Sequence, residues 1–269
     1  MRPALRTELR SAVGEHRSTN QDSAGAGPSC AIVADGVGGR AAGDVASAHT
    51  VHTVLAALTA DPEPQGWDAD AVRGVVARAN AGLAALSAQD PTLIGMATTL
   101  TAIVAVDDAV LVAHVGDSRA YLVHAGEGHR VTRDDSLVQE LVDQGSVDPA
   151  DAWQHPHRNI ILWSLSGGLT DPGHLRVQRV PTVPGDRWLL ASDGLTDYVA
   201  EQQVLQVLVD EQDPAAAADT LMAMALGADA RDNVTLAVVD VVDGVDDLPP
   251  AAPVAMAGAA LALAPRLAT

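Results

Sequence analysis

The sequence predicts an α+β sandwich in which antiparallel strands form the interior and helices cover the outer faces. Strand-length apolar runs follow one another directly in the middle of the chain, without the alternating strand and helix rhythm of a parallel sheet. One pair of helical patterns precedes these runs, and another pair follows them. With 269 residues and no evident internal repeat, the chain is expected to form one large domain.

The strands are assigned from apolar runs that are bounded by turn residues. They are expected over residues 7–13, 29–34, 98–106, 109–117, 119–126, 175–183, 186–193 and 233–242. Only short turns separate the three runs between residues 98 and 126, which favours an antiparallel meander.

The helices are assigned from apolar positions at helical spacing and from the residues at their ends. They are expected in a pattern that follows Gly39–Gly43 and extends to about residue 60, and over 68–88, 134–144, 201–211 and 213–227. The segment 145–160 has little periodicity and is expected to be irregular.

The C-terminal composition differs from that of the rest of the chain. Residues 1–243 carry the strand and helix patterns, whereas residues 244–269 are rich in Ala and Pro. Prolines interrupt the longest apolar stretch of this region, which is too short to span a bilayer. We therefore expect one domain over 1–243 and a flexible tail over 244–269.

Charge and cysteine content exclude several classes of partner. Sixteen basic residues, all Arg, stand against 35 acidic ones, and the net charge of −19 argues against binding to nucleic acid or to an anionic membrane. The single cysteine, Cys30, excludes an internal disulfide framework, and no signal segment is expected before the domain. These features favour a cytoplasmic protein, which we expect to be a monomer.

Carboxylates stand at the ends of several predicted strands. Asp35, Asp117 and Asp193 each follow an apolar run, and Asp232 directly precedes another. If these ends converge, only a cation can hold the negative charges together, and hard divalent ions such as Mg²⁺ and Mn²⁺ prefer oxygen ligands. Two ions that share a carboxylate can activate a water molecule for attack on a phosphate ester. Arg17 can then bind the phosphate oxygens.

Eight motifs in this order resemble those of the PPM/PP2C family of metal-dependent protein serine/threonine phosphatases, in particular its bacterial type. They are RSTNQD, VADGVGG, GMATTLTAIV, HVGDSRAYL, TRDDSLVQELVDQG, HPHRNIILWSL, GDRWLLASDGLTD and ARDNVTLAVV, and they span residues 8 to about 241. The resemblance implies a four-layer αββα sandwich, with two antiparallel sheets flanked by helix pairs.

The resemblance also assigns roles to residues of this chain, with two Mg²⁺ or Mn²⁺ ions as cofactors. It implies Asp35 as the carboxylate that bridges the two ions, the Gly36 carbonyl as a ligand of one ion, and Asp193 and Asp232 as ligands of the other. Asp22 is implied to act near the ions through water and hydrogen bonds. The remaining implied roles are phosphate binding by Arg17 and a third, weaker metal site formed by Asp117 with Asp193.

Two positions depart from the family pattern or from part of it. Gln21 stands where the family usually has Glu, so one metal site is expected to bind more weakly. Val37 stands where eukaryotic relatives carry a histidine proposed as general acid, and bacterial members also have a hydrophobic residue there. The leaving oxygen then needs another proton source: His155 is the first candidate, His157 is the second, and metal-bound water competes with both. A structural role for these two histidines is weighed equally.

The expected function is hydrolysis of phosphoserine and phosphothreonine in phosphoproteins that a serine/threonine kinase modifies. A thiol mechanism is excluded because Cys30 lacks a phosphate-cradling loop and arginine directly after it. One alternative is an inactive family member that binds phosphoproteins as a regulator, and Gln21 is its only support. Another is a switch phosphatase that acts on an anti-sigma-factor antagonist. The irregular segment 145–160 lies where bacterial relatives have a mobile flap, and it is expected to influence substrate choice.

Overall fold

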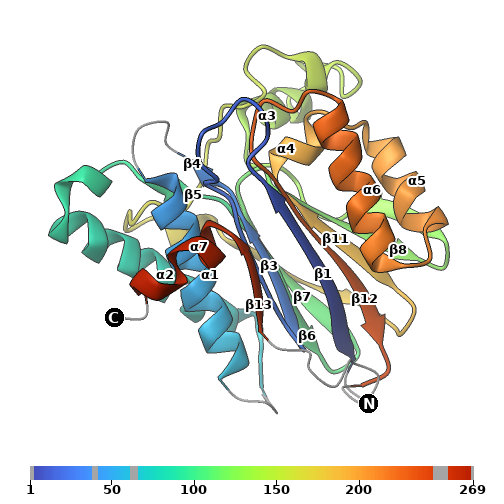
Figure 1. Cartoon of the computed structure of the whole chain (residues 1–269), viewed down its shortest axis with the longest axis horizontal. Coiled ribbons are helices and arrows are strands. Elements are labelled where there is room, and N and C mark those ends of the chain that lie inside the picture. Colours follow the sequence, from blue (N-terminus) through green and yellow to red (C-terminus); the bar gives the residue numbers. More distant parts are fainter. Residues whose placement is uncertain (1–2, 38–41, 61–65, 245–253, 268–269) are drawn as a thin grey trace.

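The computed structural model describes residues 3–37, 42–60, 66–244 and 254–267, with side chains up to Ala264 in the last range. The chain forms two antiparallel sheets packed face to face, with helices outside each sheet (Figure 1). The predicted four-layer αββα sandwich is confirmed. Part of the predicted glycine-rich approach to the first helix lies outside the described residues.

The first sheet has five strands and joins the beginning of the chain to its end. Its order is β1-β12-β11-β8-β9, with bounds Ala4–Ala12, Val234–Val242, Arg187–Ala191, Arg119–His124 and Glu127–Arg130. The β1 and β12 strands pair along nine residues, from Ala4 with Val242 to Ala12 with Val234. This long pairing brings Asp232, just before β12, close to the loop that follows β1.

The second sheet has six strands. Its order is β10-β7-β6-β3-β2-β13, with bounds Arg176–Pro181, Ala109–Val115, Leu100–Val106, Cys30–Ala34, Ser23–Gly27 and Ala255–Gly258. Central strands β6, β7 and β3 are buried at every residue, as continuous apolar runs require. A small third sheet pairs β4 (Gly36–Val37) with β5 (Ala97–Thr98).

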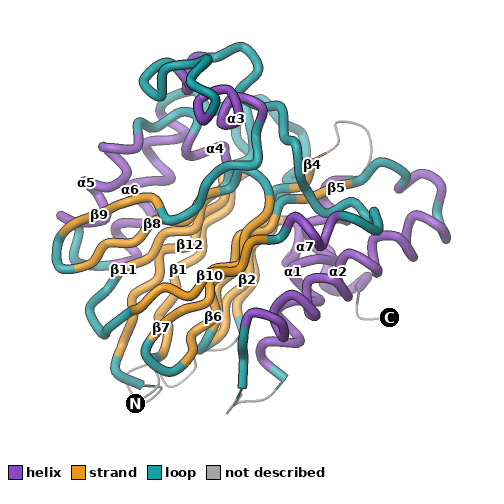
Figure 2. Tube along the Cα trace, turned by 180° about the vertical axis from the view of Figure 1, so that it is seen from behind, coloured by secondary structure: helices purple, strands orange, loops and turns teal. Residues whose placement is uncertain are grey.

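Helices bury one apolar layer against each sheet. Helices α1 (Gly43–Thr59) and α2 (Ala69–Gln89) pack on the second sheet, whereas α5 (Glu201–Asp210) and α6 (Pro214–Gly227) pack on the first (Figure 2). A third apolar layer, which includes Trp188 and Ile103, lies between the two sheets. Because the chain has no Phe, small and branched side chains fill these layers.

The predicted meander is wrong in its last strand. The β6 and β7 strands pair as expected, but β8 lies in the other sheet, where it pairs with β11 and β9. The turn at 116–118 therefore crosses from one sheet to the other. Both faces of β8 are apolar: Tyr121 and Val123 pack under the helices, and Ala120 and Leu122 pack between the sheets. Its sequence therefore predicts a buried strand but does not determine its neighbour.

The predicted flexible tail is also wrong for residues 255–267. The β13 strand pairs with β2 from Ala255 with Ala26 to Gly258 with Ser23, and helix α7 (Ala259–Leu267) follows it and packs on α1. Residues 245–253 lie outside the described part. Within the described ranges, no helix has both the length and the apolar character needed to cross a bilayer.

Candidate metal centre and active site

The backbone at Asp35 is held by two threonines, Thr98 at the end of β5 and Thr99 just before β6. Asp35 follows β3, and its N–H donates to Thr99 Oγ1 at 2.9 Å. The Asp35 carbonyl accepts from the Thr99 N–H at 2.9 Å and from Thr98 Oγ1 at 2.9 Å. The TT pair of GMATTLTAIV therefore fixes the end of the strand that carries this carboxylate.

Close backbone packing explains the glycine that follows Asp35. A Cβ on Gly36 would lie 2.2 Å from the Gly43 carbonyl oxygen and 2.4 Å from the Gln21 carbonyl oxygen. The Gly36 N–H donates to the same Gln21 carbonyl at 3.2 Å. No side chain fits there, so only glycine lets β4 pass between the two neighbouring backbones.

Asp22 is the least exposed of the predicted carboxylates, with 1% of its surface exposed. Ser192, just before helix α4 (Asp193–Thr196), donates from its Oγ to Asp22 Oδ2 at 2.8 Å. Asn20 accepts from the Asp22 N–H at 3.1 Å. Segments 170 residues apart are thereby joined directly behind the acidic cluster.

Five carboxylates interact in one cluster at the end of the sandwich where α4 begins. Burial, followed by the charges of Asp22 and Asp193, holds the pKa of Asp35 well above its ordinary value. Burial and the charge of Asp117 do the same for the pKa of Asp193. The charge of Asp232 contributes to both shifts. The structure thus brings together the carboxylates that the sequence placed at separate strand ends.

Two members of the cluster have pKa values near neutrality. Burial raises the pKa of Asp22 to about 6, and burial together with the charges of Asp134 and Asp197 raises the pKa of Asp117 to about 7. Desolvation disfavours the ionised form, and each neighbouring carboxylate adds repulsion. A cation placed among these groups would relieve both effects.

The residues present fit hard divalent ions in their chemistry. All donors of the cluster are oxygens, as Mg²⁺ and Mn²⁺ prefer. Asp117 Oδ1 and Asp193 Oδ1 are buried and have no hydrogen-bond partner, which is a costly state for a carboxylate oxygen. In the described part of the chain, no group of three acidic, His or Cys side chains is already arranged around one point to hold an ion.

Arg17 contacts the cluster through Asp232. Its Nη2 donates to Asp232 Oδ2 at 2.6 Å, and its Nε donates to the Arg231 carbonyl at 3.1 Å. The Arg17 side chain is 43% exposed, so it lies at the rim of the site, where it can reach an anionic ligand.

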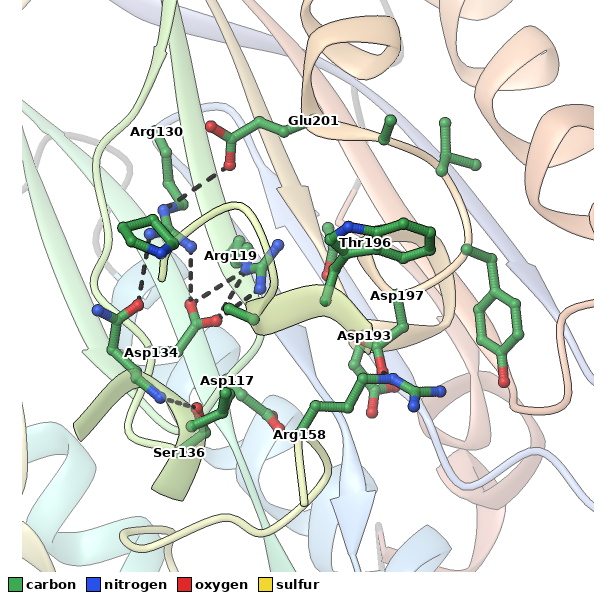
Figure 3. Close-up of a pocket in the computed structure, with 18 of the residues that line it drawn as sticks. Asp117, Arg119, Arg130, Asp134, Ser136, Arg158, Asp193, Thr196, Asp197 and Glu201 are labelled. Atoms are coloured by element: carbon green, nitrogen blue, oxygen red, sulfur yellow. Dashed lines mark hydrogen bonds and ion pairs between the residues drawn. The ribbon is translucent and has the colours of Figure 1, made fainter. Parts of the chain in front are cut away.

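A cavity of about 720 Å³ opens beside the cluster. Asp117 and Asp193 line it, and the irregular segment 145–160 contributes Trp153 and Arg158 to its wall. Figure 3 shows Arg158 extending toward Asp193 and Asp197, and Arg158 Nε donates to Asp197 Oδ2 at 3.0 Å. The segment expected to act as a flap therefore borders the acidic groups directly.

His155 does not contact the carboxylates in the described structure. Its ring packs edge-to-face on His157, with centroids 5.5 Å apart, and its Nδ1 accepts from the His157 N–H at 3.2 Å. Gln21 donates from its backbone N–H to Asn233 Oδ1 at 2.8 Å, and its side chain lies against Gly43.

Several residues of the site were not predicted from the sequence. Arg119 forms a bidentate pair with buried Asp134 through Nε and Nη2, with distances of 2.7–3.1 Å. Asp197 lies one helical turn after Asp193, and burial raises its pKa. The i to i+4 spacing in DGLTD could have revealed Asp197. Ser192 has no comparable signal, because it acts on a residue far away in the sequence.

Fold and site together define a class, that of metal-dependent phosphatase domains built on two packed antiparallel sheets. Comparison with known families agrees: the family described as protein phosphatase 2C matches residues 15–231. The chain belongs to the protein phosphatase 2C family. The match ends one residue before Asp232, so the C-terminal strands and α7 lie outside it.

Curated relatives and solved structures include bacterial serine/threonine phosphatases. The serine/threonine protein phosphatase PstP of Mycobacterium tuberculosis is 41% identical over 242 residues, which cover 89% of this chain but 45% of PstP. The chain thus spans less than half the length of that relative. The serine/threonine phosphatase stp of Listeria monocytogenes is 33% identical, with 88% of this chain and 96% of stp covered.

A solved structure of the PstP catalytic domain aligns with a TM-score of 0.81 and 39% identity, covering 90% of this chain and 100% of that one. That domain was crystallised in complex with two manganese ions.

Proposed function

We propose that the chain hydrolyses phosphoserine and phosphothreonine in phosphoproteins at a binuclear Mg²⁺ or Mn²⁺ centre. The observation that carries this proposal is the cluster of Asp22, Asp35, Asp117, Asp193 and Asp232 at one end of the sandwich, where burial and neighbouring carboxylate charges raise the pKa of Asp35 and of Asp193. Family membership supports it, as do relatives named as serine/threonine phosphatases, one of them with two manganese ions.

In this proposal, Asp35 would be shared by the two ions and the Gly36 carbonyl would bind one of them. Asp193 and Asp232 would bind the other ion, and Asp22 would orient water near the ions. Asp117 and Asp193 offer their unpartnered oxygens to a third, weaker ion. When bound, such ions lower the pKa of water and neutralise phosphate charge.

The residues at the rim would hold the substrate. Arg17 exchanges its Asp232 partner for the phosphate oxygens, which a guanidinium binds with two parallel hydrogen bonds. The cavity beside Trp153 and Arg158 receives the chain that flanks the phosphorylated residue. Trp153 is 63% exposed, so its indole ring offers an apolar surface on which the peptide can pack.

The leaving serine or threonine oxygen needs a proton. His155 is proposed to provide it after movement of the segment 145–160 toward the cluster, since it has no contact with the carboxylates in this conformation. His157, its ring partner, is the second candidate.

The biological setting follows from the same proposal. The substrates are products of a serine/threonine kinase, and the protein acts as a cytoplasmic monomer. Its strongly acidic charge of −19 disfavours nucleic acid as a ligand.

The experiment is phosphate release from a phosphothreonine peptide by the full chain, with EDTA, Mg²⁺ and Mn²⁺ compared. Release that requires metal and is abolished by Asp35→Asn supports the proposal, provided that the variant melts as a folded protein. Peptide binding by the folded wild type without release under any metal would favour the inactive phosphoprotein-binding member instead. Asp243→Asn, at an exposed position just after the end of β12, is the matched control and should retain activity.

A further inference from the structure

We call β13 and α7 (residues 255–267) the C-terminal arm. Its strand ends directly behind Asp22, a residue of the proposed metal site. The first residue of α7, Ala259, donates its N–H to the Asp22 carbonyl at 2.7 Å. The β13 strand is the edge strand of the second sheet (Figure 1), and Figures 1 and 2 show α7 beside α1. The arm lies outside the part of the chain that the family match covers, which ends at residue 231.

The turn between β13 and α7 is shaped to fit Asp22. Gly258 has φ of +67°, a left-handed conformation that favours glycine. A Cβ at Gly258 would lie 2.2 Å from the Asp22 carbonyl oxygen and 2.9 Å from Ser11 Oγ. Any side chain there would push the arm and the Asp22 backbone apart.

The same turn touches a polar network that reaches the Asp22 side chain. Ser11 Oγ accepts from Asn20 Nδ2 at 2.8 Å and shares a hydrogen bond with Thr235 Oγ1 at 2.7 Å. The Ser192 hydroxyl accepts from the Thr235 N–H at 3.0 Å and donates to Asp22 Oδ2 at 2.8 Å. The arm thus contacts both the backbone of Asp22 and the network that orients its carboxylate.

Packing and one further hydrogen bond hold the arm in place. Ala259 and Ala260 are 2% and 0% exposed, and Met256 packs into the core beneath α1 and α2. From α1, His52 donates from Nε2 to the Ala260 carbonyl at 2.8 Å, since a carbonyl can only accept. This contact lies one residue after the bond to Asp22 and can be altered without changing the cluster itself.

We infer that the C-terminal arm positions the backbone of Asp22 and thereby sets the ion affinity of the centre proposed above. The inference rests on the proposed function, because Asp22 matters to ion binding only if the cluster holds metal. Residues that orient metal-site groups from behind commonly change metal affinity when they are replaced. His52 and Gly258 are then positioning residues that act through Asp22.

The test measures Mn²⁺ affinity of the full chain without substrate, from the free Mn²⁺ signal in electron paramagnetic resonance. His52→Leu should weaken binding about five-fold, the scale of one lost hydrogen bond, and Gly258→Ala should weaken it at least as much. His52→Gln retains an amide donor and should stay within about two-fold of the wild type. Val75→Ala, which removes buried packing in α2, is the control for general loss of stability and should leave Mn²⁺ affinity unchanged.

Asp35→Asn separates the two ways in which the inference can fail. Wild-type Mn²⁺ binding that Asp35→Asn removes, but that His52→Leu and Gly258→Ala leave unchanged, overturns the role of the arm and leaves the proposed function intact. A wild type with no Mn²⁺ binding that depends on Asp35 overturns both. If Gly258→Ala does not fold, the comparison of His52→Leu with His52→Gln decides the inference. If Val75→Ala weakens Mn²⁺ binding as much as the arm variants do, the arm only stabilises the fold, and the inference is overturned.

Discussion

The metal-free protein should lose stability as the pH rises from about 4 to 7. Asp22 and Asp117 are buried in the folded chain, and their ionisation in this pH range is more favourable in the unfolded chain. In the folded chain the pKa of Asp22 is about 6, against an ordinary value of 3.8. The folded state therefore holds this proton more tightly than the unfolded state does. The contribution of Asp22 to the free energy of unfolding is complete below pH 3.8 and decreases as the pH rises from 3.8 to about 6. Above about pH 6 the loss amounts to about 3 kcal/mol, at about 1.36 kcal/mol per pKa unit.

Asp22→Asn tests this reasoning, because it removes the ionisation but keeps an oxygen that can accept the Ser192 hydrogen bond. About 1.4 kcal/mol of the free energy of unfolding that the wild type loses through Asp22 is lost between about pH 5 and about pH 7.5. Both pH values lie above the isoelectric point, which is near 4.5. This difference corresponds to about 3–5 °C in Tm for a chain of this size. Urea unfolding and thermal melting in EDTA at both pH values measure it directly.

The wild type should therefore lose more stability between these two pH values than Asp22→Asn does. Asp151→Asn removes an exposed carboxylate and should behave as the wild type. Adding Mn²⁺ at the higher pH should raise the wild-type Tm, since ion binding stabilises the ionised cluster. Equal pH dependence in the wild type and Asp22→Asn would refute the assignment of this destabilisation to Asp22.

Three further predictions concern activity. Arg17→Ala should raise KM for phosphopeptides about 10- to 100-fold with a smaller change in kcat, the scale of charge-assisted hydrogen bonds to phosphate; an unchanged KM in steady-state assays would remove Arg17 from the substrate site. Gln21→Glu should lower the half-saturating Mn²⁺ concentration, since a carboxylate adds charge beside the centre; titration of activity with Mn²⁺ would show no shift if the amide is no handicap. Asp193→Asn should abolish phosphate release at any practical Mn²⁺ concentration, and near wild-type release would show that its assignment as a ligand is wrong.

Local patterns predicted the central strands and the carboxylates at their ends. The run before Asp35 is apolar at every residue, which predicts a buried strand. Asp-Gly after such a strand is ordinary turn chemistry, and only its recurrence at Asp117 and Asp193 pointed to a site. Asp193 was expected at the end of a strand, but it is the first residue of α4, because β11 ends at Ala191 and Ser192 precedes the helix. The carboxylate still lies in the cluster, since the strand brings the chain to the same end of the sheet.

Strands built from small or polar residues could not be predicted from the sequence. The β2 strand, SAGAG, is buried at every position, but it has neither branched side chains nor an alternating pattern to identify it. The β9 strand reads EGHR and has no apolar face. In the C-terminal arm, four weakly alternating residues become a strand only because β2 offers an edge for pairing.

Contacts between distant segments also cannot be predicted from local sequence patterns. The hydrogen bond from Ser192 to Asp22 spans 170 residues, and the hydrogen bond from Ala259 to the Asp22 carbonyl joins the C-terminal arm to the segment before β2. No local spacing encodes either contact. Both follow from the arrangement of the sheets, so the site's supporting hydrogen bonds become visible only in the folded chain.

The central claim is that the buried carboxylates form a binuclear metal centre, and the most direct measurement is the number of Mn²⁺ ions bound per chain. Equilibrium dialysis near neutral pH should give two tightly bound ions for the wild type and for Asp151→Asn. Asp35→Asn, which lacks the bridging carboxylate, should bind fewer than one ion while remaining folded. A wild type that binds no Mn²⁺, or an Asp35→Asn variant that still binds two ions, would contradict the account.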